Sequence, residues 1–512
     1  MRVRLLHRDR DVDLEQSLRP NAETLLQDLG LDAVLAAMGG GDAYLWQLAR
    51  HALLTGPESP AAIRYRQGVL ADFLARPELA RRLYALASEG VDARKAARFF
   101  WFRDTPDIQR QKALAMLELL VGLLERLRGL ADEHAAAVAS EGLREFFASL
   151  RNELDDAYLA LLHTRLRELQ FRDGVLLSAR LGHACRGRDY ALRRPRGGGL
   201  LGRLTPELPR GLSFSVSPRD EHGQRALGEL RDRGLAHVAN ALAQATDHIL
   251  AFFRTLQAEA GFYVACLNLA ERLATREVPI VLPEAAEADE LALQARGLRD
   301  PSLALHAGSP VVGNDLDADG RRLLVVTGAN EGGKSTFLRS LGVAQLMLEA
   351  GMFVTAEAFR GSVSSGVYTH FKREEDVGLR SGKLDEELRR MREIAQRIQP
   401  HGLLLCNESF ASTNEAEGSE IARQVVQALV EDGVRVAYVT HMYELARGFH
   451  ERRLPATLCL RAERRPDGSR TYRILPGPPQ PTSYGVDSYR RVFGRDPTAT
   501  GTAPAGSVRS SR

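Results

Sequence analysis

Residues 323–341 constrain the fold of this chain most, because a buried strand, a glycine-rich turn and a helix follow one another without interruption. The apolar run Leu-Leu-Val-Val-Thr at 323–327 leads into Gly328-Ala-Asn-Glu-Gly-Gly-Lys-Ser-Thr336, and helix-forming residues come next. Glycines at this spacing let backbone N–H groups surround phosphate oxygens, while the lysine reaches the outer phosphates and the serine holds Mg²⁺. The sequence therefore predicts a phosphate-binding loop between a strand and a helix.

Each residue of this loop has an expected role around a nucleotide. The lysine, Lys334, also belongs to the predicted catalytic set, because its charge opposes the charge on the transferring phosphate. The serine, Ser335, is also a predicted Mg²⁺ ligand. ATP and Mg²⁺ are therefore the expected cofactors. The full set predicted to bind the cofactor within the loop is Gly328, Asn330, Gly332, Gly333, Lys334, Ser335 and Thr336.

Two later strands end in residues that suit nucleotide hydrolysis. The apolar run 402–406 is followed by Asn407 and Glu408, and the run 434–440 is followed by His441. Glu408 is the predicted general base for the attacking water, and His441 is a predicted contact of the γ-phosphate. Asn407 stands where an aspartate normally orders the Mg²⁺ shell, so it is the second predicted metal residue, with hydrogen bonding kept and a charge removed.

Composition excludes several classes of protein but does not indicate a binding partner. The chain has 512 residues, 44% of them hydrophobic, and a net charge of +3, which is too close to neutral to indicate nucleic-acid binding by itself. Its four cysteines are widely spaced, so neither a zinc site nor a disulfide framework is predicted. We find no apolar run long enough to cross a membrane and no secretory signal, and we expect a cytoplasmic protein without membrane association.

The pattern of apolar residues divides the chain into two halves. Residues 22–300 follow mainly a helical period, whereas residues 302–475 alternate short strands with helices, which predicts a largely parallel sheet covered by helices. The arginine-, glycine- and proline-rich stretch 186–211 interrupts the helices and is either a solvated loop or a contact to a DNA backbone. Residues 494–512 are predicted to be a disordered tail.

Ordered motifs between 314 and 445 resemble the MutS family of DNA mismatch-repair ATPases. They are Asn314-Asp315, the loop at 328–336, the stretch Asn-Glu-Ser-Phe-Ala-Ser-Thr-Asn-Glu-Ala-Glu-Gly at 407–418, and Thr-His-Met-Tyr-Glu-Leu at 440–445. A further stretch at 375–388 resembles the family loop whose serine enters the nucleotide site of the partner subunit. An ungapped alignment places Gly382 at that serine, and Ser381 is the nearest substitute, so Ser381 joins the predicted cofactor-binding set.

The resemblance implies a multidomain protein with an all-α core, lever and clamp half and a C-terminal α/β ATPase domain of the ABC type. The implied function is ATP-dependent DNA binding in DNA repair, by a homodimeric clamp on duplex or branched DNA with composite ATP sites. No counterpart of the family's mismatch-reading domain or of a C-terminal nuclease is visible. The implied ranges are 1–95 for the core, 96–300 for the lever and clamp, 301–493 for the ATPase and 494–512 for the tail.

Two alternatives remain open at this point. Asn407 is compatible with a protein that binds ATP as a switch and does not hydrolyse it. Another ABC-type DNA-repair ATPase is also conceivable, although the Leu-Ser-Gly-Gly-Gln signature of that class is not found before residue 402. Measured phosphate release separates the first alternative from a true ATPase.

Overall fold

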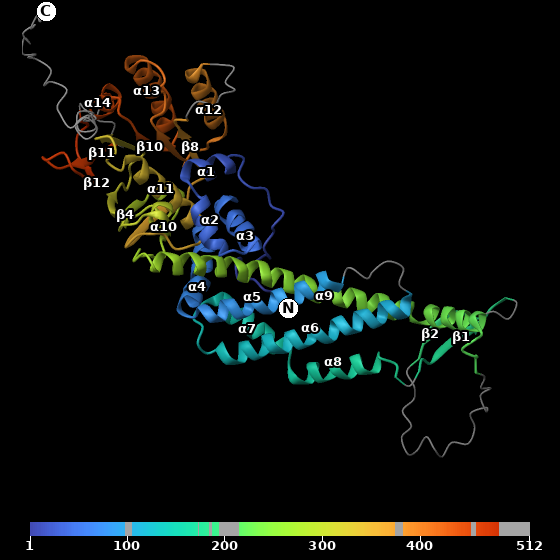
Figure 1. Ribbon diagram of the computed structural model, residues 1–512. Helices are drawn as coiled ribbons and strands as arrows, with labels where there is room; N and C mark the ends of the chain where they lie inside the picture. Colours follow the sequence, from blue (N-terminus) through green and yellow to red (C-terminus); the bar gives the residue numbers. More distant parts are fainter. Residues whose placement is uncertain are drawn as a thin grey trace, which may run out of the picture. The chain divides into compact units, whose positions relative to one another are not determined.

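The chain forms two compact units in the computed structural model (Figure 1). The first unit contains residues 1–12 and 78–261, and the second contains residues 13–77 and everything from 262 onward. Among the residues described, no helix has both the length and the apolar character needed to cross a membrane. The domain ranges expected from the sequence remain a prediction. The structure describes residues 1–97, 105–172, 174–183, 187–193, 215–373, 382–451 and 457–480.

The first unit is built mainly from long helices that pack through leucine and phenylalanine side chains. Buried residues of α6, α8 and α9, including Leu117, Leu166 and Leu242, form one of its apolar clusters. Short polar residues begin α6, α7 and α8, as Thr105 does for α6 by accepting a hydrogen bond from the Ile108 N–H. The helices are α5 (Pro77–Ala97), α6 (Pro106–His134), α7 (Glu141–Glu153), α8 (Asp156–Glu168) and α9 (Glu221–Ala274), which continues into the second unit after residue 261.

A two-stranded hairpin departs from the all-α expectation for this half. Strands β1 (Leu177–Leu181) and β2 (Gly187–Leu192) pair antiparallel, with Leu177 opposite Leu192. Gly187 and Gly174 interrupt the helical pattern here, and pairing two strands satisfies the backbone groups that a helix would otherwise satisfy. Part of the predicted loop 186–211 is therefore strand. Residues 194–211 lie outside the described residues, as do Cys185 and the predicted tail 494–512.

The second unit is built around a six-stranded sheet in the order β12-β11-β6-β10-β9-β8. All neighbouring pairs are parallel except β11 with β12, which confirms the largely parallel sheet predicted from the sequence. The apolar residues 352–354 favour a further strand, but they contribute only an isolated bridge between Val354 and Val281. The strands are β6 (Leu323–Gly328), β8 (Val367–Phe371), β9 (Leu403–Asn407), β10 (Arg435–Val439), β11 (Thr457–Arg464) and β12 (Arg470–Pro476).

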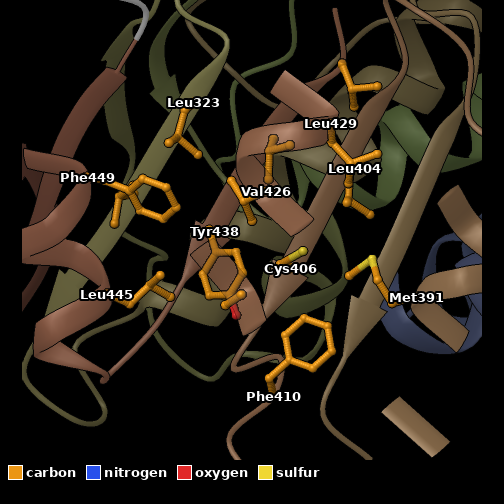
Figure 2. Close-up of a cluster of buried hydrophobic side chains, with 14 of the residues drawn as sticks. Leu323, Met391, Leu404, Cys406, Phe410, Val426, Leu429, Tyr438, Leu445 and Phe449 are labelled. Atoms are coloured by element: carbon orange, nitrogen blue, oxygen red, sulfur yellow. The ribbon is translucent and has the colours of Figure 1, made fainter. Parts of the chain in front are cut away.

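Helices cover both faces of this sheet. Alternating residues of β9 point to opposite faces, with Leu404 and Cys406 in a cluster with the helices α12 to α14 (Figures 1 and 2). Leu405 points the other way and touches α11 so closely that a Cβ on Gly342 would lie 2.6 Å from it. The helices are α11 (Lys334–Glu349), α12 (Lys383–Arg397), α13 (Glu415–Glu431) and α14 (Tyr443–Glu451).

A second sheet of four strands, in the order β3-β7-β4-β5, lies in the same unit and was not predicted. Its strands are short and contain arginine, aspartate and glycine, so they lack the continuous apolar run that marked the central strands. The strands are β3 (Glu284–Ala286), β4 (Leu293–Leu298), β5 (Asn314–Asp317) and β7 (Ala358–Ser362). The remaining helices of the unit are α1 (Ala22–Leu29), α2 (Asp32–Gly39), α3 (Ala43–Leu54), α4 (Pro60–Ala75) and α10 (Pro301–His306).

Candidate nucleotide-binding site

The predicted phosphate loop connects the end of β6 to the start of α11. Gly328 and Gly333 have φ angles of 108° and 87°, which glycine adopts without strain. A Cβ on Gly328 would lie 2.9 Å from the backbone nitrogen of Ala462, so strand β11 leaves no room for a side chain there. The loop therefore has the strand-turn-helix geometry that the sequence predicted, with the N-terminus of a helix of 16 residues at its end.

Lys334 is held inside the loop. Its Nζ donates hydrogen bonds of 2.9 Å to the carbonyl oxygens of Gly328 and Ala329, and only 6% of the residue is exposed. Burial lowers the pKa of Lys334, whereas the carboxylate of Glu408 acts in the opposite direction. An ammonium group has three donors, so the third can be directed at a ligand while two keep the lysine in place.

Ser335 and Asn407 meet although 71 residues separate them in the chain. The Ser335 hydroxyl donates a 3.0 Å hydrogen bond to Oδ1 of Asn407, which lies at the carboxyl end of β9. Both groups offer neutral oxygen atoms, which Mg²⁺ accepts as ligands. Among the described residues, no group of three or more His, Cys, Asp or Glu side chains could hold a metal. The pair fits an ion that keeps most of its coordination with water and phosphate oxygens.

Glu408 and His441 lie together at the ends of adjacent strands. Oε1 of Glu408 is 3.7 Å from Nδ1 of His441, and both side chains are partly exposed. The backbone of Glu408 has a φ of 54°, and its N–H donates to the carbonyl of Val439, which turns the chain sharply after β9. The nearby imidazole of His441 holds the pKa of Glu408 below its usual range, although burial opposes this effect. Glu408 is thus an ionised carboxylate that can accept a proton.

If the site hydrolyses ATP, as the sequence predicts, substitution of His441 by alanine should move the acid limb of the kcat/KM profile for that reaction to higher pH. The reason is that Glu408 loses the partner that lowers its pKa, so the carboxylate is protonated, and inactive as a base, at a higher pH than in the wild type. The measurement is the pH dependence of phosphate release from pH 4 to 8. His450→Ala, an exposed histidine on α14, is the matched control; an unmoved limb in His441→Ala would contradict the assignment.

Most of the loop residues line one cavity of about 760 Å³ together with Glu408 and His441, whereas Gly328 and Asn407 are not part of its lining. One part of it is polar and contains the loop residues with Glu408 and His441, while Leu303, Pro310 and Val311 provide an apolar part. Such a combination suits a nucleotide, whose phosphates are charged and whose base is flat and largely apolar on its faces. The sequence-predicted residues that line the cavity are Asn330, Gly332, Gly333, Lys334, Ser335, Thr336, Glu408 and His441.

Tyr472 also lines this cavity, and sequence reasoning missed it. It belongs to β12, has a φ of 60° and is 52% exposed. Asn314 fixes the strand beside it, because its Nδ2 donates to the Tyr472 carbonyl at 3.3 Å and its Oδ1 accepts from the Ile474 N–H at 2.7 Å. No sequence motif surrounds Tyr472. The only indication in the sequence was indirect, because its neighbour Asn314 belongs to the Asn314-Asp315 motif that resembles the MutS family. Ser381 lies outside the described residues.

Comparison with known proteins agrees with this geometry. The family model of the MutS2 N-terminal domain matches residues 58–276, and that of MutS domain V matches residues 324–493. The chain belongs to the MutS family. The MutS resemblance inferred from the motifs is therefore confirmed, and the match to a MutS2 domain is a closer description of the helical half than the motifs provided.

Individual relatives match this MutS-family chain over part of their length. Endonuclease MutS2 of Thermus thermophilus is 32% identical over 194 residues, which is 35% of this chain and 26% of the relative. DNA mismatch repair protein MutS of Chloroflexus aurantiacus is 30% identical over 152 residues, or 29% of this chain and 16% of the relative. MutS protein homolog 4 of Mus musculus is 25% identical over 233 residues, which is 46% of this chain and 24% of the relative. The matched regions thus span about a quarter or less of these relatives.

Proposed function

We propose that this protein binds and hydrolyses ATP and uses the two nucleotide states to control its hold on DNA during repair. The observation that supports the proposal best is the meeting of a phosphate loop, a buried lysine and an ionised carboxylate at one cavity. The loop follows β6 and the carboxylate follows β9, and both strands pair in parallel with β10, so their carboxyl ends lie at the same edge of the sheet. Ligands of open α/β sheets bind at that edge.

Each group has a separate task in this proposal. Lys334 and the loop amides would hold the phosphates, and Ser335 with Asn407 would contribute to the Mg²⁺ shell. Mg²⁺, when bound, supplies positive charge that neutralises the β- and γ-phosphates. Glu408 would orient the attacking water and accept its proton, while His441 keeps Glu408 ionised and lies at the edge that would face the γ-phosphate.

The DNA part of the proposal rests on membership of the MutS family and on the names of its relatives. We infer a homodimer with composite ATP sites, to which Ser381 contributes, and we infer that residues 96–300 supply lever and clamp helices. The same reasoning assigns residues 1–95 to a core domain and 301–493 to the ATPase domain, in the cytoplasm. A clamp of this kind works only if ATP binds one conformation more tightly than the other.

Substitution of Lys334 by alanine tests the proposal as a whole. The variant loses charge-assisted hydrogen bonds to the phosphates, so its affinity for ATP should fall about a hundredfold. Retention of a DNA duplex is then measured with and without ATP, at a stated salt concentration. We expect ATP to change retention by the wild type and not by Lys334→Ala.

Lys95→Ala is the matched control, because this exposed lysine pairs only with Asp92 among the ion pairs described. It should bind ATP like the wild type. Identical DNA retention by the wild type and by Lys334→Ala, with and without ATP, would exclude a nucleotide-driven clamp.

A second candidate function, an ATP-binding switch with little hydrolysis, follows from the neutral side chain at Asn407. Asn407→Asp adds a carboxylate beside Ser335, so the affinity for Mg²⁺ in the presence of nucleotide should rise about tenfold, and turnover should rise with it. The measurement is the Mg²⁺ dependence of phosphate release. Asn152→Asp, on the exposed surface of α7, is the control. An unchanged rate would show that Asn407 does not limit turnover.

A further inference from the structure

His370 is a buried histidine that does not line the nucleotide cavity and yet contacts the segment that carries Glu408. It lies on β8, where it pairs with Cys406 of β9, and it has no exposed surface. Its ring stacks on Phe410, with centroids 5.5 Å apart and an angle of 29° between the planes. The ring therefore packs against the sharp turn that follows β9, at Phe410, which lies two residues after Glu408.

Three polar contacts connect His370 to the turn after β9 and to helix α12. Its Nδ1 lies 2.7 Å from Oγ of Ser409, and the same hydroxyl lies 2.7 Å from the carbonyl oxygen of His370. Its Nε2 lies 3.0 Å from the carbonyl oxygen of Glu387, on α12. The carbonyl of Ser409 in turn accepts a 2.6 Å hydrogen bond from the hydroxyl of Tyr438. Ser409, which directly follows Glu408, is thus held on both its side chain and its backbone.

The donors and acceptors assign the protonation of the ring. Burial, aided by the nearby charge of Arg390, lowers the pKa of His370 to about 4, so the ring is neutral at pH 7. The carbonyl of Glu387 can only accept, so Nε2 carries the hydrogen and Nδ1 is the acceptor. The single hydroxyl hydrogen of Ser409 therefore has two acceptors within 2.7 Å, both on His370. Either choice keeps Ser409 attached to His370.

Helix α12 is joined to the same turn by a second contact. Oε1 of Glu387 accepts a 2.9 Å hydrogen bond from Ser412, while Oε2 is buried and has no hydrogen-bond partner among the described residues. Glu387 itself is only 4% exposed. The turn that begins at Glu408 is therefore attached to α12 at both Ser409 and Ser412, in one case through His370. A shift of α12 would therefore displace Ser409, which is the residue next to Glu408.

We propose that His370 is a positioning residue for Glu408, which it holds in place by anchoring Ser409 to strand β8 and helix α12. This proposal rests on the proposed ATP hydrolysis. His370 touches no reacting atom and does not line the cavity, so its loss should leave ATP binding intact. Its loss should instead let the strained backbone at Glu408, with a φ of 54°, relax away from the water.

Three variants test the proposal through kcat and KM for ATP hydrolysis. His370→Phe keeps the ring stacked on Phe410 and removes its hydrogen bonds, and it should lower kcat about tenfold with KM within about twofold. Ser409→Ala removes the other partner and should have a similar effect, and the double variant should be no slower than either single variant, because both lose the same link. His370→Asn places an amide near the position of Nδ1 and should restore most of kcat.

His401→Gln is the matched control. This histidine lies just before the start of β9, at the end of the strand away from the cavity, and its ring bonds the carbonyl of Ala288. Rates are divided by the concentration of bound nucleotide, so loss of folded protein does not imitate loss of kcat. Should His370→Phe fail to fold, Ser409→Ala and His370→Asn still decide the question. Unchanged kcat, or effects that multiply in the double variant, would overturn the positioning role alone. A wild type that releases no phosphate would overturn the proposed hydrolysis together with it.

Discussion

Replacing Glu408 with glutamine is expected to lower kcat for ATP hydrolysis about a thousandfold, which lies within the range for loss of a general base. Glutamine has nearly the same shape and can still bind a water molecule, but it cannot accept the proton. The affinity for ATP should stay within about twofold, because Lys334 and the loop amides are unchanged. The carboxylate that is lost is an ionised one, since His441 lowers the pKa of Glu408.

The two quantities are measured separately, with single-turnover phosphate release for the chemical step and a fluorescent ATP analogue for binding. Glu451→Gln is the control, because this glutamate is an exposed partner of Arg447 on α14. If Glu408→Gln leaves an already negligible rate unchanged while ATP still binds, the protein is a nucleotide switch. If it leaves a substantial rate unchanged, another group is the base.

Replacing Glu259 with leucine should destabilise the first unit by about 3 kcal/mol, because three backbone N–H groups lose an acceptor and each such loss costs about 1–3 kcal/mol when the donor is buried. Glu259 has no exposed surface, and its carboxylate accepts hydrogen bonds from the backbone N–H groups of Leu5, Leu6 and Val12. Leucine would remove the acceptor that these three N–H groups share. The segment 1–12 should therefore detach from α9 before the rest of the unit unfolds.

Denaturant unfolding followed by helical signal, together with limited proteolysis of residues 1–12, measures this effect. Glu229→Gln, on the exposed surface of α9, should change stability by less than about 0.5 kcal/mol. A Glu259→Leu variant as stable as this control would show that the segment contributes nothing to the fold.

The same carboxyl predicts a pH dependence with a definite sign. Burial raises the pKa of Glu259 from 4.5 to about 7, although the three backbone hydrogen bonds oppose the change. Between these values the folded protein keeps a proton that the unfolded chain has released, so raising the pH through this window favours unfolding. Stability should therefore fall as the pH rises from about 4.5 to about 7. This part of the slope should vanish in Glu259→Leu, and its persistence there would assign it to another group.

Local sequence was sufficient to predict the structure where one short segment contains the whole structural unit. The phosphate loop needs only a strand, a turn and a helix that are adjacent in the chain, so Gly328 to Thr336 could be predicted with its geometry. Glu408 and His441 could be predicted because each ends an apolar strand, and parallel strands bring their carboxyl ends to one edge. The four-stranded sheet could not be predicted, because its strands are short and polar and pair with strands that lie far away in the sequence.

By itself, the sequence determined that this protein contains a phosphate loop of the MutS type, because that loop is specified by residues in direct succession. Only the tertiary structure decided which distant groups complete the site: Asn407 against Ser335, Tyr472 beside the cavity, and His370 beneath the turn at Glu408. Their hydrogen bonds join residues that are 17 to 158 positions apart. Such contacts form only after the strands have paired, so they cannot be predicted from a local sequence pattern.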